Sequence, residues 1–136
     1  MALTTACTVP EIIDMAKRAG LDKVADRIDY LHRLPLEDDA DPMDPDSARS
    51  LVSFLIRHHR ELPETGITMN PEGHVHGEWT FTEDSDLGVQ FLPSGDVWFM
   101  YLDIDRDTGS LKAREKGTVS PDDMLKKIMP LVNGAT

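Results

Sequence analysis

The residues of this sequence that are best placed to do chemistry are two histidines and a glutamate at alternate positions, His74, His76 and Glu78. Alternate residues of a β-strand point to one face, so the two imidazoles could bind zinc, copper or nickel. These three groups would spread over about 13 Å of strand, whereas a tetrahedral ion usually takes ligands from more than one element. Further ligands would have to come from His58 or His59. We therefore predict no metal and no other cofactor, and keep His74 and His76 as secondary metal candidates.

A second candidate is the segment DIDRDTGSLKARE, in which Asp103, Asp105 and Asp107 have the alternate spacing of a calcium-binding loop. The remainder of the segment does not match that loop. Gly109 stands at loop position seven rather than six, and Arg114 occupies position twelve, where a bidentate glutamate is needed. We interpret the segment as a hairpin turn between two strands.

Recognisable catalytic motifs are absent from the sequence. It contains no glycine-rich phosphate loop and no G-x-S-x-G turn. The one cysteine, Cys7, has no obvious histidine partner. A single cysteine forms neither an internal disulfide nor a multi-cysteine zinc site. We predict that the chain is not an enzyme.

Length and charge indicate a small single-domain protein and argue against nucleic-acid and membrane binding. The 136 residues, 40% of them hydrophobic, predict a single domain over residues 1–136. The formal net charge of −11 disfavours direct nucleic-acid binding and permits a basic protein partner. No apolar run approaches the roughly 20 residues needed to cross a bilayer, and we see no signal peptide. We therefore expect a cytoplasmic protein without membrane contact.

Residues 1–63 carry helical patterns. Thr8 and Glu11 have the spacing of a capping box, which predicts the start of the first helix. Apolar residues at helical spacing predict helices over residues 9–19, 21–34 and 47–62. The acidic segment 36–46, with two prolines, is predicted to be a solvated loop between the second and third helices.

From Gly66 the period changes from helical to alternating, and turn signals recur about every ten residues. This pattern predicts a meander of four or five antiparallel strands over residues 66–119. Ser120 and Pro121 then mark the start of a last helix over residues 120–131. The predicted class is α+β, with helices packed on one face of the antiparallel sheet.

Alternation also predicts which side chains share a sheet face. Val75, Trp79 and Phe81 should face the core. If PSGD makes a short turn, Phe91 pairs near Trp98. Trp98, Met100 and Leu102 then join the core. The opposite face would carry His74, His76, Glu78, Gln90, Val97, Phe99 and Tyr101.

Such a mixture of aromatic and polar side chains is typical of a recognition surface. Phe99 and Tyr101 would be the aromatic anchors of a protein partner. The exposed carboxylates of the acidic loop, Asp38, Asp39 and Asp41, would attract a basic partner and speed its association. The alternative is that a helix, or a second copy of the chain, covers this face.

The segment ITMNPEGHVHGEWTFTEDSDLGVQFLPSGDVWFMY resembles the β-region of a widespread group of small, poorly characterised bacterial proteins. The shared pattern is a proline-containing entry, a strand of the "dG-x-x-x-E-W" kind, a strand with alternating apolar residues, and a glycine turn before an aromatic strand. The matching residues are Pro71, Gly73, Glu78, Trp79, Leu87, Val89, Phe91, Ser94, Gly95 and Tyr101. The resemblance covers about residues 25–103, although a "gWDgyga-P" stretch is reduced here to LPLEDDADPMDP. It implies the β-meander but no established activity and no catalytic residues.

Together these patterns favour a small acidic protein-binding module. Its most specific form is an antitoxin, immunity protein or phage-type inhibitor that masks a basic site on its partner. The resemblance is compatible with this form, because proteins of that group often look like accessory or mobile-element gene products. Two alternatives stay open: a metal- or small-ligand-binding protein centred on His74 and His76, and a homodimeric accessory protein.

Overall fold

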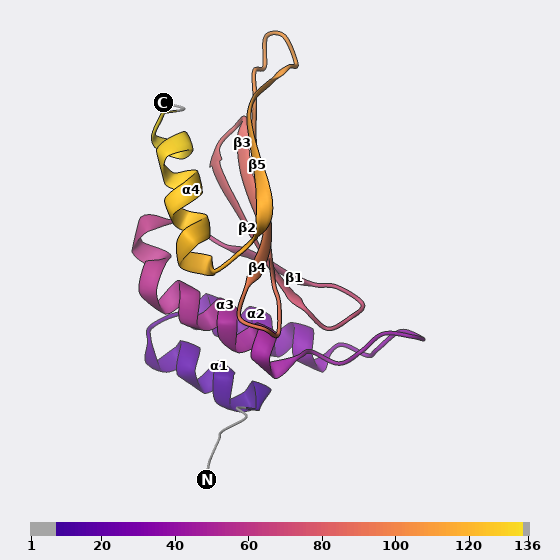
Figure 1. Cartoon of the computed structure of the whole chain (residues 1–136). Coiled ribbons are helices and arrows are strands. Elements are labelled where there is room, and N and C mark those ends of the chain that lie inside the picture. The colour runs from indigo at the N-terminus through magenta and orange to yellow at the C-terminus, as the bar shows by residue number, and fades with distance from the viewer. Residues whose placement is uncertain (1–7, 135–136) are drawn as a thin grey trace.

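The computed structural model describes residues 8–134 and has the predicted α+β class (Figure 1). In chain order the elements are α1 (Val9–Arg18), α2 (Asp22–Arg33), α3 (Pro45–His58), the short 3-10 helix η1 (His59–Glu61), β1 (Gly66–Met69), β2 (Val75–Thr82), β3 (Ser85–Phe91), β4 (Val97–Ile104), β5 (Leu111–Val119) and α4 (Pro121–Gly134). The predicted N-terminal helices, antiparallel meander and C-terminal helix are confirmed. None of the helices in the described range is long and apolar enough to cross a membrane.

Side-chain caps begin three of the helices. Thr8 and Glu11 form the predicted capping box of α1: the Glu11 amide donates to Thr8 Oγ1 at 3.3 Å, and the Thr8 amide donates to Glu11 Oε1 at 3.3 Å. The Asp44 carboxylate accepts two amide N–H groups of α3, at 2.8 and 3.1 Å. The Ser120 hydroxyl accepts one from α4 at 3.1 Å. These bonds satisfy donors that have no partner within the helix.

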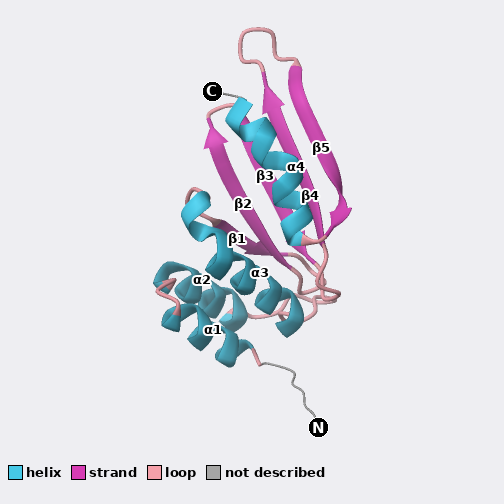
Figure 2. Cartoon of the chain, turned by 60° about the vertical axis from the view of Figure 1, so that its left-hand side comes forward, coloured by secondary structure: helices cyan, strands magenta, loops and turns pink. Residues whose placement is uncertain are grey.

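The strands form one antiparallel sheet in the order β1-β2-β3-β4-β5. Helices α3 and α4 pack on the same face of this sheet (Figures 1 and 2). Helix α1 packs on the far side of α3, and α2 packs against α1 and the edge strand β1. No helix of the described residues covers the other face. We call this uncovered side the open face.

The core lies between the sheet and the helices α3 and α4. Phe54 of α3 is fully buried, and its ring centroid lies 5.8 Å from those of Trp79 and Phe91. Burial of such large apolar side chains is the main force that holds the helices on the sheet. The other buried side chains on this face of the sheet include Ile67, Val75, Leu87, Val89, Val97, Phe99 and Tyr101.

The predicted pairing of β3 with β4 was wrong by one residue. Phe91 pairs with Val97 rather than Trp98. The turn between the strands has three residues, 93–95, and is closed by a hydrogen bond from the Leu92 amide to the Asp96 carbonyl at 3.0 Å. Gly95 takes the positive φ, 99°, that such a loop needs at its last position. An even-numbered turn would have given the predicted pairing, so this one extra residue exchanges the two faces of β4.

Phe99 and Tyr101 therefore do not lie on the open face. Both are fully buried in the core. Trp98, Met100 and Leu102, which were predicted to join the core, point outward instead.

The second half of the acidic segment is docked on the β1–β2 turn, not simply solvated. The Asp41 amide donates to the Pro71 carbonyl at 2.7 Å, and the Asp44 amide donates to the Gly73 carbonyl at 2.9 Å. Met43 is buried in the core. Gly73 has φ 83°, and a Cβ there would lie 2.1 Å from the Pro42 carbonyl oxygen. Glycine therefore permits this close backbone contact.

Candidate functional site

The outward side chains of the sheet form cross-strand rows, because all five strands are in antiparallel register. We name each row by its residue on β4. The Trp98 row contains Thr68, His76, Gln90, Trp98 and Thr118. The Met100 row contains Gly66, Glu78, Gly88, Met100 and Lys116. The Leu102 row contains Thr80, Asp86, Leu102 and Arg114.

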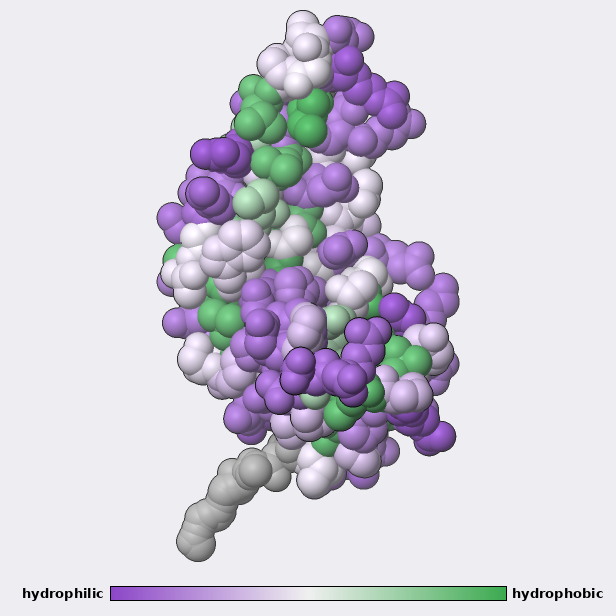
Figure 3. All heavy atoms as spheres, turned by 90° about the vertical axis from the view of Figure 1, so that its right-hand side faces the viewer, coloured by the Kyte–Doolittle hydropathy of each residue, from purple (hydrophilic) through white to green (hydrophobic). Residues whose placement is uncertain are grey.

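An apolar stripe runs along β4 and the start of β5 on the open face. Trp98 is 40% exposed, Ile104 39% and Leu111 53%, and Met100 and Leu102 are half-buried between them. Figure 3 shows apolar side chains gathered on the upper part of this face, with polar and apolar side chains mixed below them. A solvated sheet face normally carries mostly polar residues, so a contiguous apolar stripe indicates a contact surface.

Charged side chains of opposite sign lie on either side of the stripe. Glu78 on β2 and Asp86 on β3 are acidic, whereas Arg114 and Lys116 on β5 are basic. None of the four belongs to an ion pair in residues 8–134. Asp86 accepts only a hydrogen bond from the Thr80 hydroxyl at 3.0 Å. These charges are therefore available to a partner.

A hollow of about 370 Å³ interrupts the face at Gly88. Gly88 has no side chain, and a Cβ built there would meet no atom within 4 Å. The hollow is bounded by the acidic side chains of Glu78 and Asp86 and by the apolar side chains of Met100 and Leu102. The open face thus has both a recess and a projecting stripe.

His74 and His76 lie at the polar end of the open face. The Gln90 amide nitrogen donates to His74 Nδ1 at 2.7 Å, which ties the histidine to the neighbouring strand. His76 Nε2 is buried and has no hydrogen-bond partner among the described residues. Burial lowers the pKa of His76, because the charged imidazolium loses hydration there, and nearby Glu78 partly offsets this effect.

Replacing His76 with glutamine is expected to flatten the pH dependence of stability on the acid side of neutrality. Because the pKa of His76 is lower in the folded chain, the unfolded chain binds the proton more readily, so the free energy of unfolding falls as pH drops below about 6.5. Urea unfolding at a series of pH values from about 7.5 to 5 measures this slope. The control is Leu36→Gln, which introduces the same amide at an exposed, non-titrating position and should keep the wild-type slope. A His76→Gln variant with the wild-type slope would contradict the assignment.

The histidines do not assemble into a metal centre. Within residues 8–134 there is no group of three His, Cys, Asp or Glu side chains that could hold a metal ion. His58, considered as a further ligand, lies elsewhere: its Nε2 is 3.1 Å from Asp122 Oδ1 of α4. This bond, with a second one from Arg57 at 3.1 Å, lowers the pKa of Asp122 and holds α4 against α3. Cys7 lies outside the described residues.

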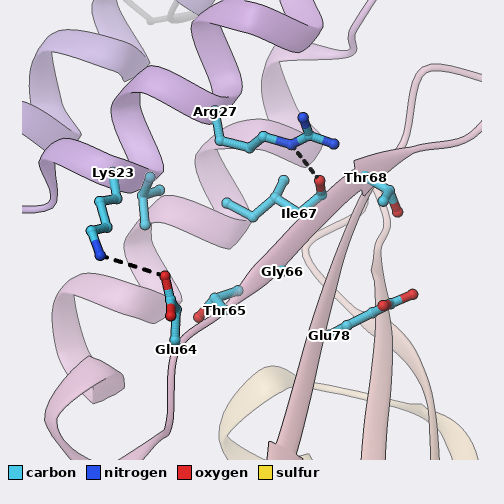
Figure 4. A pocket seen from close by; sticks show the side chains of 9 residues that line it. Lys23, Arg27, Glu64, Thr65, Gly66, Ile67, Thr68 and Glu78 are labelled. Carbon is cyan, nitrogen blue, oxygen red and sulfur yellow. Dashed lines mark hydrogen bonds and ion pairs between the residues drawn. The ribbon is translucent and has the colours of Figure 1, made fainter.

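A second hollow, of about 420 Å³, lies where α2 meets β1 (Figure 4). Arg27 Nε donates to the Ile67 carbonyl at 2.9 Å, and Lys23 Nζ lies 3.7 Å from Glu64 Oε1. Both basic side chains are thus engaged within the fold. The Arg27 bond occupies a backbone acceptor at the edge of the sheet, which is a common protection against unwanted strand pairing.

The predicted site residues fall into three groups. His76, Glu78 and Gln90 lie on the open face, with His74 bonded beside them. Asp38, Asp39 and Asp41 lie on the exposed part of the acidic loop, which projects on the same side of the sheet (Figure 1). Phe99 and Tyr101 belong to the core. The residues that the sequence reasoning missed are Trp98, Met100, Leu102, Ile104 and Leu111.

Comparison with known proteins identifies no relative: no family model, curated protein or solved structure matches this chain. The resemblance seen in the β-region motifs therefore stays a prediction. The open face has to be interpreted from its own chemistry.

Proposed function

We propose that this chain is a protein-binding module, without a catalytic role, that binds its partner through the open face. The observation that carries the proposal is the uncovered apolar stripe around Trp98, Met100 and Leu102. Exposed apolar side chains rimmed by polar groups are favourable to desolvate, and tryptophan is enriched among the residues that dominate binding energy. Trp98 takes the anchoring role that was expected of Phe99 and Tyr101.

The proposed partner is a protein surface that combines apolar residues with basic groups. Glu78 and Asp86 form no ion pair with any of the described residues, and the acidic loop with Asp38, Asp39 and Asp41 projects on the same side of the sheet. A formal net charge of −11 also favours encounter with a basic surface. An antitoxin, immunity protein or inhibitor acting in the cytoplasm is the most specific form of this proposal.

Site-specific photo-crosslinking in the cells that make the protein tests the proposal. A photoreactive residue in place of Trp98 or Glu78 is expected to give adducts with a protein chain after irradiation. The same residue in place of Lys127, on the outer surface of α4, should give none. Mass spectrometry of the Glu78 adduct should identify a partner segment rich in lysine or arginine. Equal labelling from all three positions, or none from Trp98 and Glu78, would show that the open face is not the contact surface.

A further inference from the structure

The charges and shapes on the open face follow a fixed order across the strands. In the Met100 row, Glu78 on β2 is followed by the hollow at Gly88 on β3, the half-buried Met100 on β4 and the cation Lys116 on β5. In the next row, Asp86 lies on β3 and Arg114 on β5. The carboxylates and the hollow therefore lie on the β2–β3 half of the face. The apolar Met100 and the two cations lie on the β4–β5 half.

This order makes the face complementary to itself under one kind of twofold rotation. When two such faces stack, a twofold axis parallel to the strands reverses the order of the strands. It leaves the position of each row along the strand direction unchanged. An axis between β3 and β4 then places β4 over β3, and β5 over β2, of the other copy. An axis across the strands would instead place β5 over β5 and bring Lys116 close to its own equivalent. Only the parallel axis brings opposite charges together.

We infer that the partner of the open face is a second copy of this chain, stacked face to face about a twofold axis parallel to the strands. This inference rests on the proposed function and names its partner. Met100 of each copy enters the hollow over Gly88 of the other. Lys116 of each copy meets Glu78 of the other, because stacked sheets lie about 10 Å apart and these two long side chains span that distance.

The stacked arrangement also determines where the acidic loop lies relative to the second copy. The loop and the β1–β2 turn project on the side of the open face (Figure 1). Because the axis keeps each row at its own position along the strands, they lie beside the Val119 end of β5 of the other copy. Arg114 and Lys116 of that copy lie over the rows of Thr80 and Glu78. The basic surface expected of a partner is then supplied by β5 of the second copy.

The size of the interface predicts a dimer of moderate affinity. Four overlapping strands, about 4.8 Å apart and about 26 Å long, bury roughly 500 Å² on each copy, near the lower limit for specific interfaces. The two chains, each of formal net charge −11, also repel one another at long range. We therefore expect dissociation in the micromolar range at an ionic strength of about 0.15 M, where this repulsion is largely screened.

Sedimentation equilibrium of the full chain, over protein concentrations from about 1 to 500 μM, tests the inference. Glu78→Lys and Lys116→Glu should each raise the dissociation constant at least tenfold. An equimolar mixture of the two variants should recover the wild-type constant, because every altered side chain then faces the opposite charge. The matched control Lys127→Glu, on exposed α4, should leave the constant unchanged.

Gly88→Val tests the recess independently of charge. A Cβ at this position meets no atom within 4 Å, and valine is favoured over glycine in a strand, so the variant should be at least as stable as the wild type. It fills the hollow that Met100 needs, so dimerisation should weaken at least tenfold.

A wild-type chain that stays monomeric throughout the concentration range, or a dimer insensitive to Glu78→Lys, Lys116→Glu and Gly88→Val, would overturn the inference. The crosslinking experiment separates this failure from that of the proposed function. Adducts from Trp98 and Glu78 to a different, basic protein would replace the second copy as the partner and leave the open face as the binding surface.

Discussion

Replacing Phe99 with alanine is expected to destabilise the fold by about 3–5 kcal/mol, the usual cost of removing a fully buried aromatic side chain. Phe99 is fully buried at the centre of the sheet, between β3 and β5. The substitution removes favourable burial and leaves a cavity that a rigid sheet cannot close. Urea unfolding followed by far-UV circular dichroism measures the change in the free energy of unfolding.

Trp98→Ala is the matched control, because it removes a larger aromatic side chain from the neighbouring position of the same strand. Trp98 is 40% exposed and points to the open face, so its loss should cost about 1 kcal/mol or less. Trp98→Ala should also weaken partner binding directly, because Trp98 lies on the open face. Phe99→Ala should affect binding only by unfolding the chain. If Trp98→Ala were the more destabilising of the two, the register between β3 and β4 would be wrong.

The contrast between these two neighbours shows where sequence reasoning stopped. Alternation identified the core face of β2 and β3, because polar or small residues alternate with large apolar ones in each strand. Trp79 in β2 and Leu87 in β3 are two of these apolar residues. In β4 the run from Val97 to Leu102 is apolar at every position, so alternation gives no face. The assignment then depended on the length of the turn alone, and one additional turn residue reversed it.

The starts of α1 and α4 were predictable for a different reason, whereas α3, predicted over residues 47–62, spans Pro45–His58. Thr8, Asp44 and Ser120 cap the helices that follow them through bonds within three residues. Such interactions are local, so a short sequence pattern is sufficient to predict them. The α+β order followed from the change of hydrophobic period near Gly66, which is also a local signal.

The docking of the acidic segment was not predictable, because it depends on contacts between distant residues. Met43 is surrounded by acidic residues and prolines in the sequence, but it is buried in the core. Gly73 permits the close approach of Pro42, and nothing in the sequence near Pro42 indicates that approach. The candidate surface was only partly predictable for a related reason. The faces of His76 and Gln90 followed from alternation within their own strands, whereas the face of Trp98 depends on the length of the turn between β3 and β4.

Ser47 joins α3 to the sheet through a buried hydroxyl group. Its hydroxyl lies in a fully buried position at the start of α3. It donates to the Phe91 carbonyl at 2.5 Å and accepts the Val75 amide at 2.7 Å. Val75 and Phe91 are paired across β2 and β3, so a single hydroxyl joins the helix to both strands that carry the acidic half of the open face.

Ser47→Ala is expected to destabilise the fold by about 2–4 kcal/mol, although it removes only one oxygen atom. The substitution leaves the Val75 amide and the Phe91 carbonyl without this buried partner, and each unsatisfied group costs about 1–3 kcal/mol. Ser50→Ala makes the same chemical change on the same helix, at a half-buried residue whose side chain makes no hydrogen bond within residues 8–134, and should stay within about 0.5 kcal/mol of the wild type. Parallel urea titrations of the two variants give the comparison. Equal stabilities would mean that water or a shift of α3 satisfies the two backbone groups, and that the helix is held on the sheet by apolar packing around Phe54 alone.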